Sequence, residues 1–112
     1  MIKRVAIYSL PAGTDSSEFW NYLMNIHNPA FLKACGARLK RMVNHRVTKI
    51  LVGQPKFWGM TETWWESEET MEEAFRGVES FKYADGTLMR GDFISRIKGE
   101  PFISIVEENE VT

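Results

Sequence analysis

The 112-residue sequence has one cysteine and lacks any apolar run near the roughly 20 residues that cross a bilayer. Because Cys35 has no partner, an internal disulfide and a multi-cysteine zinc site are excluded, and a reducing, cytoplasmic location is expected. The net charge of −1, from 14 basic and 15 acidic residues, provides no overall attraction to phosphates or anionic lipid. We therefore expect neither nucleic acid nor a membrane among the partners.

Linkers, repeats and low-complexity tracts are also lacking, and the length fits a single domain over residues 1–112. Aromatic residues are abundant instead. Four Trp and seven Phe are many large rings for so small a core. Some of these rings are expected to line a pocket or to meet a partner.

The spacing of apolar residues predicts the order strand, helix, strand, strand, helix, strand. The expected strands are residues 2–10, 39–52, 57–66 and 101–107. The first helix is expected to begin after the capping residue Asp15 and to end at Gly36, with a kink after His27 caused by Pro29.

The second helix is expected to begin after Ser67 and to be loosened by Gly77 and Ser80, and residues 81–94 are interpreted as a broken helix or a lid. Gly53 to Pro55 is expected to form a turn. The whole order indicates an α+β domain, in which both helices cover one face of a four-stranded antiparallel sheet. A bare apolar face is rare in a monomer, so we expect a symmetric homodimer, sheet against sheet.

Residues 18–29 carry an acidic and an aromatic residue followed by the pattern His27-x-Pro29. This segment resembles the first helix of the EthD-like family, and residues 42–47 and 61–67 are similar to its second and third strands. The resemblance implies a ferredoxin-like βαββαβ subunit that dimerises into an α+β barrel, with a ligand cleft between sheet and helices. It also implies chemistry without metal or cofactor, as in relatives that are isomerases, cyclases or accessory proteins of ether degradation.

His27 is the main catalytic candidate. It lies on the inward face of the first helix beside Trp20, Met24 and Phe31, so its imidazole would reach an apolar cleft. There a neutral ring can act as general base or acid near pH 7. The alternative is a core histidine with one hydrogen-bond partner, and both interpretations stay open.

Glu62 lies in the middle of an aromatic-rich strand, where an unpaired carboxylate is costly. It is a candidate to orient His27 or to act as an acid of raised pKa, and the alternative is an ion pair with a basic residue such as Arg46. His45 is interpreted as interfacial or structural. A zinc or iron site of His27, His45 and Glu62 is disfavoured by their spacing, so no metal is expected.

Arg46 is a candidate to hold a substrate carboxylate in its planar fork, whereas other basic residues of the same segment are expected to protect a sheet edge. The predicted partner besides a second copy is a hydrophobic or aromatic small molecule. The residues expected to contact it are Tyr8, Trp20, Met24, Phe31, Arg46 and Trp64.

The predicted function is that of a cofactor-free isomerase or lyase acting on a lactone, a polyketide-like molecule or an aromatic acid. His27 would move a proton next to a carbonyl, and Glu62 or Tyr8 would steady the developing charge. The alternatives are a non-catalytic protein that holds a hydrophobic ligand for a degradative oxidase, and a cofactor-free monooxygenase. An RNA-binding sheet is disfavoured by the acidic balance.

Overall fold

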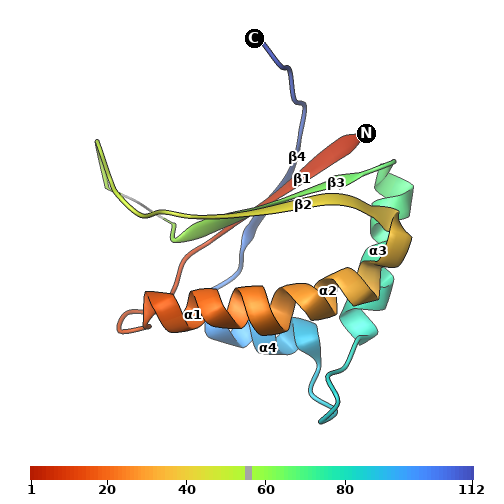
Figure 1. Cartoon of the computed structure of the whole chain (residues 1–112), viewed down its shortest axis with the longest axis horizontal. Coiled ribbons are helices and arrows are strands. Elements are labelled where there is room, and N and C mark those ends of the chain that lie inside the picture. The colour runs from red at the N-terminus through yellow and green to blue at the C-terminus, as the bar shows by residue number, and fades with distance from the viewer. Residues whose placement is uncertain (55–56) are drawn as a thin grey trace.

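The computed structural model describes residues 1–54 and 57–112, in which a sheet lies on a layer of helices (Figure 1). The strands are β1 (Ile2–Tyr8), β2 (Leu39–Arg46), β3 (Gly59–Trp65) and β4 (Phe102–Val106). The helical segments are α1 (Ser16–Tyr22), the π-helical η1 (Leu23–His27), α2 (Asn28–Cys35), the short 3₁₀ turn η2 (Gly36–Arg38), α3 (Glu68–Ser80) and α4 (Met89–Arg96).

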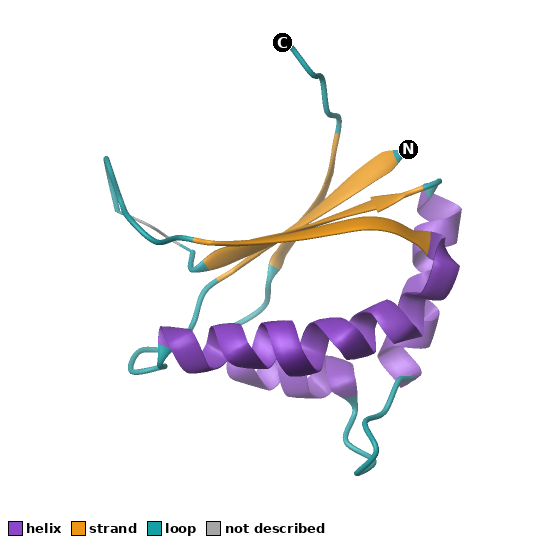
Figure 2. Ribbon diagram, in the orientation of Figure 1, coloured by secondary structure: helices purple, strands orange, loops and turns teal. Residues whose placement is uncertain are grey.

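The four strands form one antiparallel sheet in the order β2-β3-β1-β4. All the helices cover the same side of this sheet (Figure 2). The predicted α+β, ferredoxin-like architecture is therefore confirmed. The core fills the space between the two layers in two clusters, one around Trp65 and Met89 and the other around Phe19 and Leu23.

Local signals at the helix ends were predicted correctly. The carboxylate of Asp15 accepts a hydrogen bond from the Glu18 N–H at 3.0 Å, and the hydroxyl of Ser67 accepts one from the Thr70 N–H at 3.2 Å. Gly36, with φ of 61°, ends α2 in a conformation that L side chains rarely adopt. The second helix is not loosened at Gly77, because α3 continues through it, but it does end at Ser80.

The first helix does not simply kink at Pro29. It widens into the π-helical turn η1, in which the Asn28 N–H bonds to the Leu23 carbonyl, and Pro29 then falls in the first turn of α2, where no N–H is needed. Buried residues recur here every four positions. Four residues of a regular α-helix turn through more than a full circle, so each step would rotate the buried side of the helix by about 40°. The widened turn absorbs much of that drift and keeps His27 on the side that faces the sheet.

Two other predicted elements needed correction. The strand expected over 39–52 ends at Arg46, because β3 begins opposite it at Gly59 and nothing in the described chain pairs with residues 48–52. Pro55 of the expected turn lies outside the described residues. The ambiguous segment 81–94 forms a loop that leads into α4, a third helix on the covered face.

Candidate functional site

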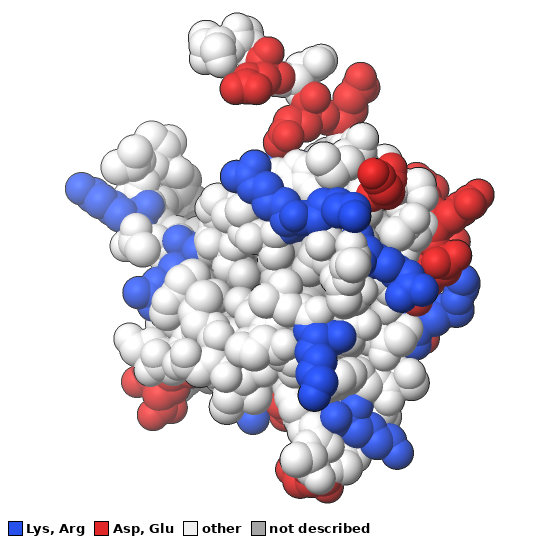
Figure 3. Space-filling model, turned by 45° about the vertical axis from the view of Figure 1, so that its right-hand side comes forward, with Lys and Arg blue, Asp and Glu red and all other residues white. Residues whose placement is uncertain are grey.

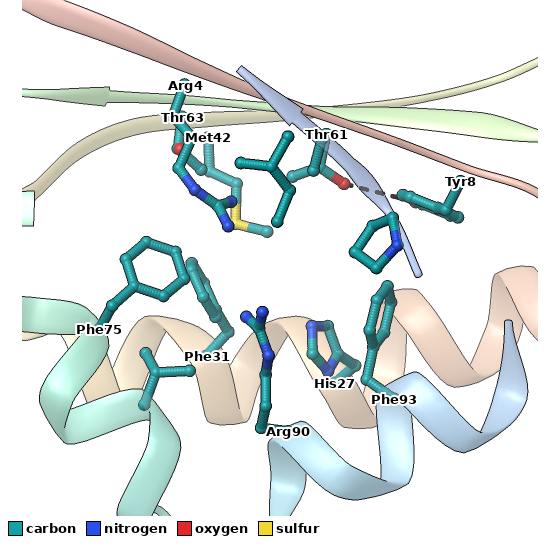
Figure 4. A pocket seen from close by; sticks show the side chains of 14 residues that line it. Arg4, Tyr8, His27, Phe31, Met42, Thr61, Thr63, Phe75, Arg90 and Phe93 are labelled. Atoms are coloured by element: carbon teal, nitrogen blue, oxygen red, sulfur yellow. Dashed lines mark hydrogen bonds between the residues drawn. The ribbon is translucent and has the colours of Figure 1, made fainter. Parts of the chain in front are cut away.

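A narrow cavity of about 50 Å³ lies between the covered face of the sheet and the helices (Figure 4). All four strands contribute to its wall, as do η1, α2, α3 and α4. Ile103, on the edge strand β4, lines the cavity and is still 41% exposed. The apolar part of the wall consists of Ala6, Phe31, Met42, Phe75, Val78, Phe93, Pro101 and Ile103.

His27 reaches this cavity from η1 and is 9% exposed. Its ring stacks on Phe93, with centroids 4.5 Å apart, and lies 6.0 Å from the ring of Phe31. Its buried Nδ1 has no hydrogen-bond partner among the described residues. Burial first, and then the positive charge of Arg90, lower the pKa of His27 to about 4, while Asp92 acts weakly in the opposite sense. The ring is therefore a neutral imidazole at pH 7, able to accept a proton.

Two guanidinium groups enter the same space from opposite layers. Arg4 descends from β1 and Arg90 rises from α4 (Figure 4). The guanidinium carbon of Arg4 lies 4.2 Å from the ring centroid of Phe75. Burial, reinforced by the charge of Arg90, lowers the pKa of Arg4 to about 10, so the group still carries its charge at neutral pH.

Tyr8 lines the cavity at the end of β1, in a chain of hydroxyl and amide groups. The Thr61 hydroxyl donates to Asn44 Oδ1 at 2.8 Å, and Tyr8 Oη lies 3.3 Å from Thr61 Oγ1. Because the single proton of Thr61 is directed to Asn44, Tyr8 must be the donor to Thr61. Burial raises the pKa of Tyr8, and the bond to Thr61 partly offsets this. The phenol thus presents acceptor lone pairs, and not its proton, to a ligand.

Glu62 and His45 lie on the other, helix-free face of the sheet, so the expected pairing of Glu62 with His27 is not formed. Glu62 forms an ion pair with Lys3 and a hydrogen bond with His45, and its side chain is only 12% exposed. Burial alone would raise the pKa of Glu62, but the hydrogen bonds from Lys3 and His45 outweigh it and hold the pKa below its usual value. The anticipated ion pair is thus present, with Lys3 in place of Arg46.

Four other predicted contact residues lie outside the described wall of the cavity. The guanidinium of Arg46 stacks on Trp20, 4.8 Å from its ring centroid, and Met24 accepts a weak hydrogen bond from Asn28. Trp64 lies on the helix-free face between Lys3 and Arg41. The disfavoured metal triad is not assembled, and no cluster of three potential metal ligands occurs within residues 1–54 and 57–112.

Sequence reasoning brought His27, Tyr8 and Phe31 to the cavity and missed Arg4, Arg90 and most of the wall. One signal for Arg4 was available. It alternates in phase with Ala6 and Tyr8, so it had to share their face of the strand. For Arg90 no comparable signal existed, because its segment was interpreted only as either a broken helix or a lid.

The surface agrees with the near-neutral composition. In the view of Figure 3, basic and acidic side chains lie around a broad uncharged area, and acidic side chains gather near the C-terminal tail. In the part of the chain that the structure describes, no helix combines the length and apolar character needed to span a bilayer.

The sheet order and the one-sided helices define the class of this protein as ferredoxin-like α+β. No family model matches the sequence, and no curated protein matches it. Solved structures do match this chain. An EthD family protein of Bacillus halodurans is 25% identical, with a TM-score of 0.71 over 97% of this chain and 99% of that one. The chain is therefore similar to EthD-like proteins over nearly its whole length, which supports the resemblance of its His27-x-Pro29 helix.

Two more distant structures share the fold. An EthD-like protein of Ralstonia eutropha is 19% identical, with a TM-score of 0.70 over 95% of this chain and 89% of that one. A protein of Arabidopsis thaliana is 14% identical, with a TM-score of 0.68 over 100% and 99% of the two chains. Similarity of fold fixes the architecture, and the chemistry has to be argued from the cavity.

Proposed function

We propose that this protein is a cofactor-free isomerase or lyase that acts on a small molecule held between the sheet and the helices. The observation that carries the proposal is the buried, neutral imidazole of His27, which borders the cavity and has an unpartnered Nδ1 among the described groups. Buried polar atoms are normally satisfied, and an exception at a cavity wall is typical of a functional group.

In the proposed reaction, His27 accepts a proton from the carbon next to a carbonyl group. The electron pair of the broken C–H bond forms an enolate, and its oxygen lies within the field of the Arg90 guanidinium. Return of the proton to a different carbon gives an isomer, whereas departure of a group from the neighbouring carbon gives an elimination product. Tyr8 is not assigned the role of steadying the charge, because its proton is committed to Thr61.

The test is proton exchange. A panel of γ-lactones, small phenolic ketones and arylacetic acids, all of which carry an α-proton, is incubated with the protein in D₂O, and loss of the α-proton signal is followed by NMR. Where exchange is found, His27→Gln is expected to slow it by about 10²–10⁴-fold, as removal of a general base does. His45→Gln is the matched control, since His45 lies on the opposite face of the sheet. Exchange that is unchanged in His27→Gln would contradict the proposal.

A second candidate function is ligand holding without chemistry, as for an accessory protein of a degradative oxidase. The observation that favours it is the pKa of about 4 of His27, because a base so weak is far from the optimum for proton transfer at pH 7. An apolar wall is sufficient for holding. Compounds of the panel that bind and never exchange their α-protons would favour this candidate.

We also propose assembly into a homodimer through the helix-free face of the sheet. Strand alternation brings large apolar residues to this face, among them Met60 and Phe102, and Phe102 is 69% exposed. Sedimentation equilibrium should give twice the chain mass, and Phe102→Glu should release single chains. Leu32→Glu, at an exposed apolar position on α2, is the control. A single-chain mass for the unmodified protein would contradict the assembly.

A further inference from the structure

We propose that the guanidinium groups of Arg4 and Arg90 form a subsite for the carboxylate of a small organic acid. The inference rests on the proposed function, because it names the chemical class of the molecule held beside His27. Arg90 takes part in both, but the subsite is tested by equilibrium binding and the proton transfer by exchange, so the two can be tested separately.

The first argument is the lack of a protein counter-ion. Basic residues such as Lys3, Arg38 and Arg96 each have an acidic partner within 4.0 Å. Arg4 and Arg90 have no carboxylate within that distance in the described part of the chain. Charged side chains inside a protein are normally paired, so two unpaired cations in one cavity lack an anion.

The second argument is geometry. Arg4 belongs to the sheet and Arg90 to α4, and both side chains extend into the cavity from these opposite layers (Figure 4). Their guanidinium carbons lie 4.2 and 5.9 Å from the ring centroid of Phe75. A ring below the guanidinium plane leaves the in-plane N–H groups free, and these are the donors that match the two oxygens of a carboxylate.

The third argument is the electrostatic field. The charge of Arg90 lowers the pKa of both Arg4 and His27, so the three groups share one poorly hydrated space. A carboxylate placed among them would remove this repulsion and would favour the protonated form of the imidazole. An anionic ligand would thereby move His27 toward the pKa at which a general base works best.

The size of the space limits the ligand. A volume of about 50 Å³ corresponds to roughly three to five water molecules, at about 10–15 Å³ for each. The cavity therefore accepts the carboxylate end of a short or single-ring acid, and a longer remainder would extend outward past Ile103, a lining residue that is itself exposed. The apolar wall suits the carbon chain of an organic acid better than the additional oxygens of a phosphate. We therefore assign a carboxylate and not a phosphate.

The test compares acids with their neutral isosteres. Butyrate and benzoate are titrated into the full-length chain by calorimetry, alongside butyramide, benzamide and inorganic phosphate. Each acid is expected to bind at least about tenfold more tightly than its amide, and Arg90→Gln is expected to remove about 10–100-fold of this affinity. Arg38→Gln, which breaks a surface ion pair with Glu73, is the charge-matched control and should leave binding unchanged.

A second readout is the titration of His27 by NMR. The charged groups of α4 that act on this ring are Arg90 and Asp92, and Arg4 of β1 lines the same cavity. Saturation with butyrate should raise the His27 pKa in the unmodified protein and not in Arg90→Gln. Arg90 is only half-buried, so this variant should fold, and its circular dichroism spectrum checks that it does.

Three results would overturn the subsite: no binding by either acid, equal binding of acid and amide, or tighter binding of phosphate than of both acids. Failure of the proposed function has a different signature, namely α-proton exchange that is unchanged in His27→Gln. Carboxylate binding that persists in His27→Gln supports the subsite whatever the outcome for catalysis.

Discussion

Lowering the pH from 7 to 5 should destabilise the folded chain through His27. Its pKa is 6.5 when exposed and about 4 in the fold, so the unfolded chain takes up the proton first. The stability that the neutral ring contributes is complete above pH 6.5 and is lost as the pH falls toward 4. For these two pKa values, linkage predicts a loss of about 2 kcal/mol between pH 7 and pH 5.

The assay is urea unfolding of the unmodified protein and of His27→Gln at several pH values between 7 and 5. Other titrating groups are common to both chains, so the difference in their unfolding free energy isolates His27. Relative to the unmodified protein, the unfolding free energy of the variant should be about 2 kcal/mol higher at pH 5 than at pH 7. A difference that does not change with pH would refute the reasoning, and His45→Gln provides the comparison for a histidine outside the cavity.

Three further outcomes are expected. Gly59→Ala should lower the unfolding free energy measured in urea by about 1–3 kcal/mol, because the added Cβ would lie 2.8 Å from the His45 carbonyl oxygen. The control Gly91→Ala in α4 should be neutral or stabilising, and equal effects of the two substitutions would contradict this prediction. The thiol of Cys35 is buried and burial raises its pKa to about 12, so it should react with a thiol reagent only after denaturation, and rapid labelling of the native chain would argue against this placement. Asp15→Ala should cost about 0.5–2 kcal/mol by removing the cap of α1, with no loss in thermal unfolding as the contrary result.

Much of the fold was predictable because its signals are local. The caps at Asp15, Gly36 and Ser67 each act within one helical turn, and each was placed correctly. The end of β2 was not placed correctly, because residues 47–52 have the composition of a strand and only the start of β3 decides where pairing stops. The helix α4 stayed undecided between a broken helix and a lid, because its apolar residues are few and Gly91 interrupts them.

The residues of the site also divide into those placed by local signals and those placed only by tertiary packing. His27 and Phe31 lie on one helix face, and helical spacing alone shows that they share it. The sides of the sheet are set by tertiary packing, so the sequence could show that Glu62 and Trp65 point in opposite directions but not which of them the helices cover. Arg4 and Arg90 belong to segments far apart in the chain, and only the folded structure shows that they meet.

The widened turn η1 has a consequence for chain length. A π-helical turn accommodates one residue more than regular α-helical winding. Deleting the exposed Asn25 should therefore close the segment into an ordinary helix with Phe19 and Phe31 still on one side, whereas the same deletion in the middle of α3 would rotate its two halves by about 100°. The segment that carries the histidine is thus the place where this helix can lose a residue and keep its orientation.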